Sequence, residues 1–96
     1  MKICICIPSR GRYNYVYRLL TSAFRTAKKS QNIIVKYYIN EDDRQLEQYK
    51  IQLERFKLRY PDSVDYIIGP DQSPVYSWNL IAENTEADLY MLAGDE

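Results

Sequence analysis

Hydrophobic residues along the chain follow two alternating patterns. Residues 2–7 are apolar at every position after the first, with isoleucines on one face of an extended segment and two cysteines on the other. A strand that is buried on both faces is typical of a parallel sheet covered by helices on both sides. Shorter, largely apolar runs over residues 33–39, 64–68 and 89–93 predict three further strands.

The segments between these strands have apolar residues at helical spacing. Asn14 can cap a first helix, in which apolar residues recur at intervals of three and one positions. A second helix is predicted over about residues 44–60, and Pro61 ends it because proline disfavours a helical residue before it. A third begins at Ser73, with Pro74 in its first turn, where the missing N–H costs nothing. The core-facing stripes of the three helices are Val16, Leu19, Leu20, Ala23, Phe24 and Ala27; Leu46, Tyr49, Leu53, Phe56 and Tyr60; and Val75, Trp78, Ile81 and Ala82.

The elements therefore alternate from strand to helix, with short connections. Right-handed crossovers between parallel strands place helices on both faces of a sheet. We expect one α/β domain over residues 1–96, with a three-layer α/β/α (Rossmann-like) fold and a four-stranded, mostly parallel sheet in the order 3-2-1-4. The chain reverses direction between the first and fourth strands of such a sheet. Open α/β sheets bind ligands in the crevice outside the carboxyl ends of the strands at this switch point.

Polar segments follow the strands and would share the carboxyl edge of the sheet. Arg10 and Arg12 follow the first strand, the acids of residues 41–43 follow the second, and Asp95 and Glu96 follow the fourth. Arginines beside carboxylates suit an anion that is bound together with a divalent cation. Simpler explanations stay open, namely solvated loop arginines and acids that are favoured by the dipole at a helix N-terminus.

The same segments resemble the nucleotide-binding half of GT-A glycosyltransferases, especially the family-2-like enzymes. Those chains commonly begin with an apolar strand, the motif Pro-Ser/Thr-x-x-Arg and a helix, which corresponds to ICICIPSRGR with Pro8, Ser9 and Arg12. The family's second strand ends in acids that contact the nucleotide base, and the corresponding stretch is YYINEDD. An Arg-Asn or similar pair on a later helix corresponds to Trp78-Asn79, and the D-x-D type metal motif corresponds to YMLAGDE.

The resemblance implies the donor-binding portion of a glycosyltransferase. A nucleotide-diphosphate sugar would bind with Mn²⁺ or Mg²⁺, for transfer of a glycosyl group to an acceptor hydroxyl. The metal would neutralise negative charge on the departing diphosphate. The family's catalytic base lies in the second half of its domain, so the resemblance also implies a partial chain that is inactive alone. The implied metal ligands are Asp95 and Glu96, and the implied donor contacts are Pro8, Ser9, Arg10, Arg12, Asp42 and Asn79.

Two features depart from the family pattern. The acids after the second strand, of which Asp42 is the expected base contact, lack the frequent D-D-G-S pattern. The terminal metal motif is also incomplete, because either Ala93 replaces its first aspartate or the motif continues past Glu96. Asp95 is the expected metal ligand in both alignments.

Composition and charge exclude several classes of protein. No apolar run reaches the ~20 residues that span a bilayer, and the first ten residues lack the cleavage site of a signal peptide. Residues 1–40 contain eight Lys or Arg and no acid, whereas residues 41–96 contain all thirteen acids. The bases are scattered through helical and strand patterns, so we expect no nucleic-acid partner.

Two cysteines, Cys4 and Cys6, lie in the first predicted strand. Side chains two residues apart on a strand share a face but are too far apart along it for good disulfide geometry. Since the chain has no His and no third Cys, a metal site of the CxC type lacks its other ligands. We expect both to be small core residues in a reducing compartment, which favours a cytoplasmic location.

A second hypothesis comes from a different functional class. The chain could be a non-enzymatic α/β module that binds a partner protein or an unrelated small ligand. The strand over residues 89–93 would form one edge of the sheet, and an exposed edge allows self-association.

Overall fold

The computed structural model describes residues 2–26, 32–70 and 73–93. These residues form strands and helices in alternation, close to the predicted positions. The strands are β1 (Ile3–Ser9), β2 (Ile33–Asn40), β3 (Val64–Gly69) and β4 (Leu89–Leu92). The helices are α1 (Asn14–Thr26), α2 (Leu46–Arg59) and α3 (Pro74–Glu83).

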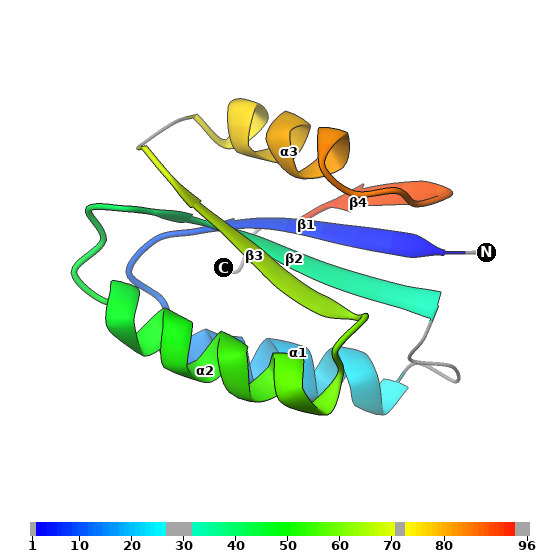
Figure 1. The fold of residues 1–96 in the computed structure, drawn as a ribbon, viewed down its shortest axis with the longest axis horizontal. Coiled ribbons are helices and arrows are strands. Elements are labelled where there is room, and N and C mark those ends of the chain that lie inside the picture. Colours follow the sequence, from blue (N-terminus) through cyan, green and yellow to red (C-terminus); the bar gives the residue numbers. More distant parts are fainter. Residues whose placement is uncertain (1, 27–31, 71–72, 94–96) are drawn as a thin grey trace.

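The strands form a parallel sheet in the order β3-β2-β1-β4, which confirms the predicted α/β fold and strand order. Helices α1 and α2 lie on one face of the sheet and α3 lies on the other, which gives three layers (Figure 1). Along β1, Cys6 pairs with Lys36 of β2 on one side and with Leu92 of β4 on the other. The carboxyl ends of β1 and β2 therefore lie next to each other.

Each face of the sheet has its own buried cluster, because side chains alternate between the faces of a strand. The cluster under α1 and α2 contains most of the predicted stripe residues of those helices. Its members are Ile7, Val16, Leu20, Phe24, Val35, Tyr37, Ile39, Tyr49, Leu53, Phe56 and Val64. The smaller cluster under α3 consists of Cys4, Cys6, Tyr38 and Ile81.

Both cysteines are core residues, as predicted. They are free and fully buried, with their sulfur atoms 3.8 Å apart. Burial raises the pKa of Cys4, and it raises the pKa of Cys6 to about 12. Thiols with such pKa values are almost entirely protonated at neutral pH and react slowly, since the thiolate is the nucleophile.

The first strand continues further than predicted. Pro8 and Ser9 were expected in a loop, but both belong to β1 and pair with Tyr38 and Ile39 of β2. The carbonyl of Cys6 accepts a hydrogen bond from the N–H of Ala93 in the segment that follows β4. Because backbone groups alternate in direction along a strand, those of residue 8 also point toward the β4 side. The paired part of β4 stops opposite Cys6. The missing N–H of Pro8 therefore leaves the β1–β4 ladder intact.

The third helix is rotated relative to its predicted stripe. Ile81 is fully buried, but Val75 is 61% exposed, so its place in the predicted stripe is wrong. Ser77 is buried instead, and its hydroxyl donates to the carbonyl of Ser73. Ser73 also caps α3, because its side chain accepts a hydrogen bond from the N–H of Tyr76.

One glycine is required by close packing at the end of β3. The hydroxyl of the buried Tyr38 donates to the carbonyl of Pro70 at 2.6 Å. The Tyr38 side chain therefore packs directly against Gly69. A Cβ on Gly69 would lie 2.5 Å from that hydroxyl oxygen. Among the described residues, no helix combines the length and the apolar character that crossing a bilayer requires.

Candidate functional site

The loops that follow β1 and β2 meet at the carboxyl edge of the sheet. Between them lies an open hollow of about 290 Å³. It is lined by Arg10, Gly11, Asp42, Asp43, Arg44 and Gln45. Two arginines and two aspartates thus come together from segments more than thirty residues apart in the sequence, at the place where open α/β sheets bind ligands.

Asp43 joins the two loops. One of its carboxylate oxygens accepts a hydrogen bond from the backbone N–H of Gly11, and the other accepts one from the N–H of Gln45, both at 2.8 Å. Gly11 has a φ of 65°, in the left-handed region that favours glycine. An added Cβ there would meet nothing within 4 Å, so backbone conformation and not space restricts this position.

Tyr49, on α2, contacts the loop after β1 through its hydroxyl group. Its buried hydroxyl accepts a hydrogen bond from the N–H of Arg12 at 2.7 Å and lies 2.6 Å from the hydroxyl of Ser9. The side-chain carbonyl of Gln45 accepts a hydrogen bond from the N–H of Tyr13 at 3.2 Å. Three successive N–H groups of this loop, from Gly11 to Tyr13, are therefore occupied.

This arrangement determines how the site can bind an anion. Phosphate sites often use free backbone N–H groups in a loop and at the start of the helix that follows it. Here side chains of the α2 region already accept hydrogen bonds from the three N–H groups that precede α1, and the N–H groups of Tyr15 and Val16 donate to the carbonyls of Arg12 and Tyr13. The groups suited to an anion are the side chains of Arg10 and Arg44, because arginine binds phosphate with two parallel hydrogen bonds. Asp42 is exposed on the same hollow and can accept hydrogen bonds.

The predicted site residues divide into three groups. Arg10 and Asp42 lie together at the hollow. Ser9 is buried against Tyr49, and Arg12 is half-buried and contributes its N–H to the support of the loop. The other predicted residues do not line the hollow. Pro8 is half-buried within β1, and Asn79 is exposed on α3, the helix on the face of the sheet away from α1 and α2 (Figure 1). Asp95 and Glu96 lie outside the described residues.

The described residues alone do not provide a metal site. Residues 2–26, 32–70 and 73–93 contain no group of three or more Asp, Glu, Cys or His side chains that could hold an ion. Asp43 already uses both oxygens to accept backbone N–H groups. Ala93, the last described residue, donates to the carbonyl of Cys6 at 3.1 Å, while the proposed ligands Asp95 and Glu96 lie outside the described residues.

Three residues of this site were missed by the sequence analysis. Arg44 and Gln45 were assigned only to the start of a helix, and Tyr49 only to a core stripe. A local signal existed for Asp43, because aspartate often accepts a hydrogen bond from the N–H two residues later, as it does here with Gln45. The role of the Tyr49 hydroxyl had no local signal, since its partners are about forty residues away.

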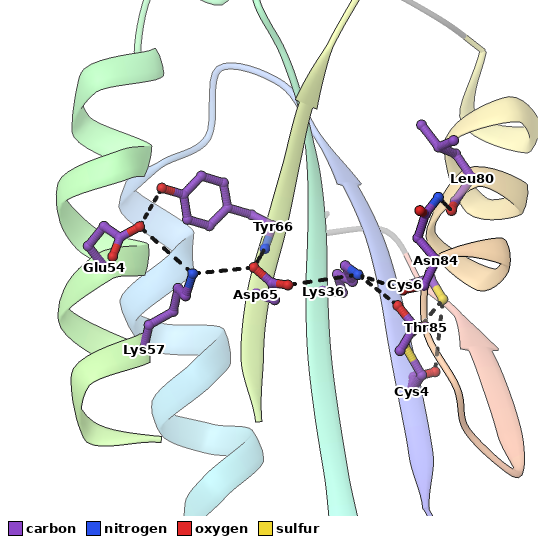
Figure 2. Close-up of polar contacts among 10 residues, drawn as sticks. All are labelled: Cys4, Cys6, Lys36, Glu54, Lys57, Asp65, Tyr66, Leu80, Asn84 and Thr85. Carbon is purple, nitrogen blue, oxygen red and sulfur yellow. Dashed lines mark hydrogen bonds and ion pairs between the residues drawn. The ribbon is translucent and has the colours of Figure 1, made fainter. Parts of the chain in front are cut away.

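A second polar cluster lies toward the amino ends of the strands (Figure 2). Lys36 is only 7% exposed, and its ammonium group donates to the carbonyl of Asn84 at 3.3 Å and to the hydroxyl of Thr85 at 2.9 Å. Asp65 lies 3.8 Å from this ammonium group and 3.5 Å from that of Lys57. A cation at a helix C-terminus interacts favourably with the helix dipole. We interpret the cluster as a structural link between α3 and the sheet.

Comparison of the chain with family models, with curated proteins and with solved structures finds no match. The functional assignment therefore depends on the residues and geometry of the hollow at the carboxyl edge.

Proposed function

We propose that the chain is the donor-binding portion of a glycosyltransferase. It binds a nucleotide-diphosphate sugar for transfer of the glycosyl group to an acceptor hydroxyl. The observation that carries this proposal is the convergence of Arg10, Arg44 and Asp42 on one hollow at the carboxyl edge of the sheet. The resemblance of the strand ends to GT-A glycosyltransferases supports the same substrate class.

The residues around the hollow can divide the recognition of such a donor. Arg10 and Arg44 bind diphosphate oxygens through charge-assisted hydrogen bonds. Asp42 accepts hydrogen bonds from the ribose hydroxyls or from the base. The hollow, at about 290 Å³, is near the lower limit of common ligand pockets, so it holds part of the donor and leaves the rest outside.

A divalent cation, Mn²⁺ or Mg²⁺, belongs to the proposal. When bound, it would supply charge neutralisation for the diphosphate leaving group. Asp95 and Glu96 are the proposed ligands, in keeping with the preference of hard cations for carboxylate oxygens. Asp43 is a poor candidate, because a shift toward an ion would break its hydrogen bonds to Gly11 and Gln45.

Isothermal titration with UDP, GDP and ADP, each with and without Mn²⁺, tests this proposal. We expect one nucleotide to bind in preference to the others, with higher affinity when Mn²⁺ is present. Arg10→Gln and Arg44→Gln should each weaken binding by about tenfold or more, since hydrogen bonds to charged groups contribute about 1.5–3 kcal/mol. Arg25→Gln, on the outer side of α1, is the matched control.

Asp95→Asn separates the metal site from the nucleotide site. This variant should bind the nucleotide equally well with and without Mn²⁺, while circular dichroism shows an unchanged fold. Identical heats for all three nucleotides, unaffected by Mn²⁺ in the unmodified chain, would contradict the donor-binding function. Mn²⁺ dependence that persists in Asp95→Asn would contradict only the assigned ligand.

One observation favours a second candidate function, a module that binds a protein partner. All four residues of β4 are exposed, from 40% for Tyr90 to 59% for Leu92, and none is charged. β4 is also an edge strand, and uncharged exposed edges pair with other strands. Self-association through β4 should then appear in sedimentation equilibrium and disappear in Met91→Lys. A wild-type chain that stays monomeric at high concentration would contradict self-association through β4.

A further inference from the structure

Helices α1 and α2 lie side by side and present one common outer face. The Tyr17 and Phe56 rings lie 5.9 Å apart, and Phe24 stacks on Tyr60 at 4.1 Å between ring centroids. Figure 1 shows both helices on the same side of the sheet, so their outward surfaces continue into each other. We call this surface the helical face. Its residues are Tyr17, Arg18 and Arg25 of α1 and Ile51, Arg55, Leu58 and Arg59 of α2, and all seven are exposed.

The helical face carries uncompensated positive charge. α1 contains no acidic residue, and no carboxylate of the described residues pairs with Arg18, Arg25 or Arg55. The two acids of α2 pair with lysines of the same helix, which leaves the arginines without a carboxylate partner among the described residues. Glu47 pairs with Lys50 at 3.6 Å, and Glu54 accepts a hydrogen bond from a β3 tyrosine and lies 4.0 Å from Lys57.

Apolar side chains stand among these arginines. Leu58 is 85% exposed and follows Lys57 and precedes Arg59, while Ile51, two turns earlier on α2, is 56% exposed. Both lie on the side of α2 opposite the buried Leu53. The exposed parts of these aliphatic side chains stay in water when the domain folds, but a partner can bury them.

The α1 part of the helical face is hollowed. A depression of about 300 Å³ is lined by Tyr17, Arg18, Thr21, Ser22 and Arg25. Arginine and hydroxyl side chains at a shallow depression suit a phosphate group, and tyrosine is favoured where an apolar region meets water. The helical face thus offers arginine and hydroxyl side chains on α1 for an anionic head group, and exposed aliphatic side chains on α2 for the apolar region beside it.

We propose that the helical face binds the surface of an anionic lipid bilayer. The four arginines contact lipid phosphates, while Leu58 and Ile51 enter the boundary between head groups and acyl chains. Polybasic surfaces are attracted to anionic leaflets, and the stems of arginine side chains bury along apolar surface while their heads stay in water. Nucleic acid explains the arginines but offers no place for two aliphatic side chains.

Co-sedimentation with vesicles tests this inference, which is independent of nucleotide binding. One vesicle is phosphatidylcholine alone, and the other contains phosphatidylglycerol at roughly one lipid in three, which gives a negative surface. We expect binding to the second vesicle only. Arg18→Gln with Arg25→Gln should lower the partition coefficient about 25-fold, because each arginine near such a surface contributes about fivefold. Leu58→Ser should lower it by about tenfold.

Matched variants separate the helical face from general effects of charge and hydrophobicity. Lys2→Gln with Arg44→Gln removes the same two charges elsewhere, and Val75→Ser removes an apolar side chain that is 61% exposed on the opposite layer. Both should bind vesicles as the wild type does. Equal binding to the two vesicles, no binding to either, or an unchanged partition coefficient for Leu58→Ser would each overturn the proposal. So would arginine-dependent binding to an oligonucleotide without binding to vesicles.

Discussion

The hydroxyl of Tyr49, on α2, accepts a hydrogen bond from the backbone N–H of Arg12 at a distance of 2.7 Å. The ring of Tyr49 belongs to the buried core, while its hydroxyl reaches the loop that carries Arg10 and Arg12. One side chain therefore connects the packing of the domain with the geometry of the candidate site. Ligand affinity at the hollow should depend on this contact even though Tyr49 does not line it.

Tyr49→Phe should destabilise the domain by about 1–2 kcal/mol. The substitution keeps the buried ring but leaves the N–H of Arg12 and the hydroxyl of Ser9 without this partner, and an unsatisfied buried polar group costs about that much. Urea unfolding followed by circular dichroism measures the change. Tyr17→Phe is the control, because the Tyr17 side chain is 59% exposed, and it should change the free energy of unfolding by less than about 0.5 kcal/mol. Equal effects of the two variants would show that the Tyr49 hydroxyl does not support the loop.

Asp42→Asn and Asp43→Asn should have opposite profiles. Asp43 accepts backbone N–H groups with both oxygens, and an asparagine would direct its NH₂ group at one of them. We expect Asp43→Asn to lose about 1–3 kcal/mol of stability. Asp42 is exposed at the hollow, so Asp42→Asn should leave stability nearly unchanged and weaken nucleotide binding. Thermal unfolding and isothermal titration give the stability and the nucleotide affinity of each variant. A loss of stability in Asp42→Asn would contradict the role of Asp42 as an exposed binding residue.

Gly69→Ala should destabilise the domain by about 1–3 kcal/mol, the range for overpacking a well-packed core. The added Cβ would meet the Tyr38 hydroxyl. Tyr38→Phe removes that oxygen atom and with it the hydrogen bond to Pro70. In the double variant the cost of Gly69→Ala should fall, which urea unfolding of the four chains measures as a coupling free energy. Strictly additive effects would mean that the backbone at residue 69, and not the contact, sets the cost.

The contribution of Tyr66 to the free energy of unfolding should fall at alkaline pH. Burial, with the hydrogen bond to Glu54 as a further cause, raises the pKa of Tyr66 from 10.0 to about 12. Since the folded state holds this proton more tightly, its contribution is fully present below pH 10 and is lost as the pH rises to about 12.

The difference in unfolding free energy between the wild type and Tyr66→Phe measures this contribution. Cys6, whose pKa is also raised to about 12, titrates equally in both chains and cancels. The difference should be constant below pH 10 and should shrink between pH 10 and pH 12. A difference that stays constant over that interval would contradict the raised pKa.

Much of the fold could be predicted from the sequence because its determinants are local or periodic. The stripe Tyr49, Leu53 and Phe56 is spaced for one face of a helix, and all three residues are buried. The doubly buried first strand predicted a covered parallel sheet, and helices lie on both faces of that sheet (Figure 1). The prediction was wrong for Val75, because its position depends on how α3 rotates against the sheet, which spacing alone does not determine.

The site could be predicted only in outline. Topology placed the loops after β1 and β2 at one edge, and Arg10 and Asp42 do lie together there. The different roles of Asp42 and Asp43 could not be predicted, because they are adjacent acids whose partners are set by the position of the other loop. Lys36 illustrates the same limit, since a buried lysine in a strand depends on the end of α3 for its hydrogen bonds (Figure 2).

Nuclear magnetic resonance tests most directly whether a nucleoside diphosphate binds between the loops after β1 and β2. Backbone amide shifts are followed while UDP, GDP or ADP is added in the presence of Mg²⁺. We expect the amides of Gly11, Arg44 and Gln45 to shift with one nucleotide, while that of Val75 on α3 stays unchanged. Shifts confined to other parts of the chain, or no shift with any of the three nucleotides, would contradict it.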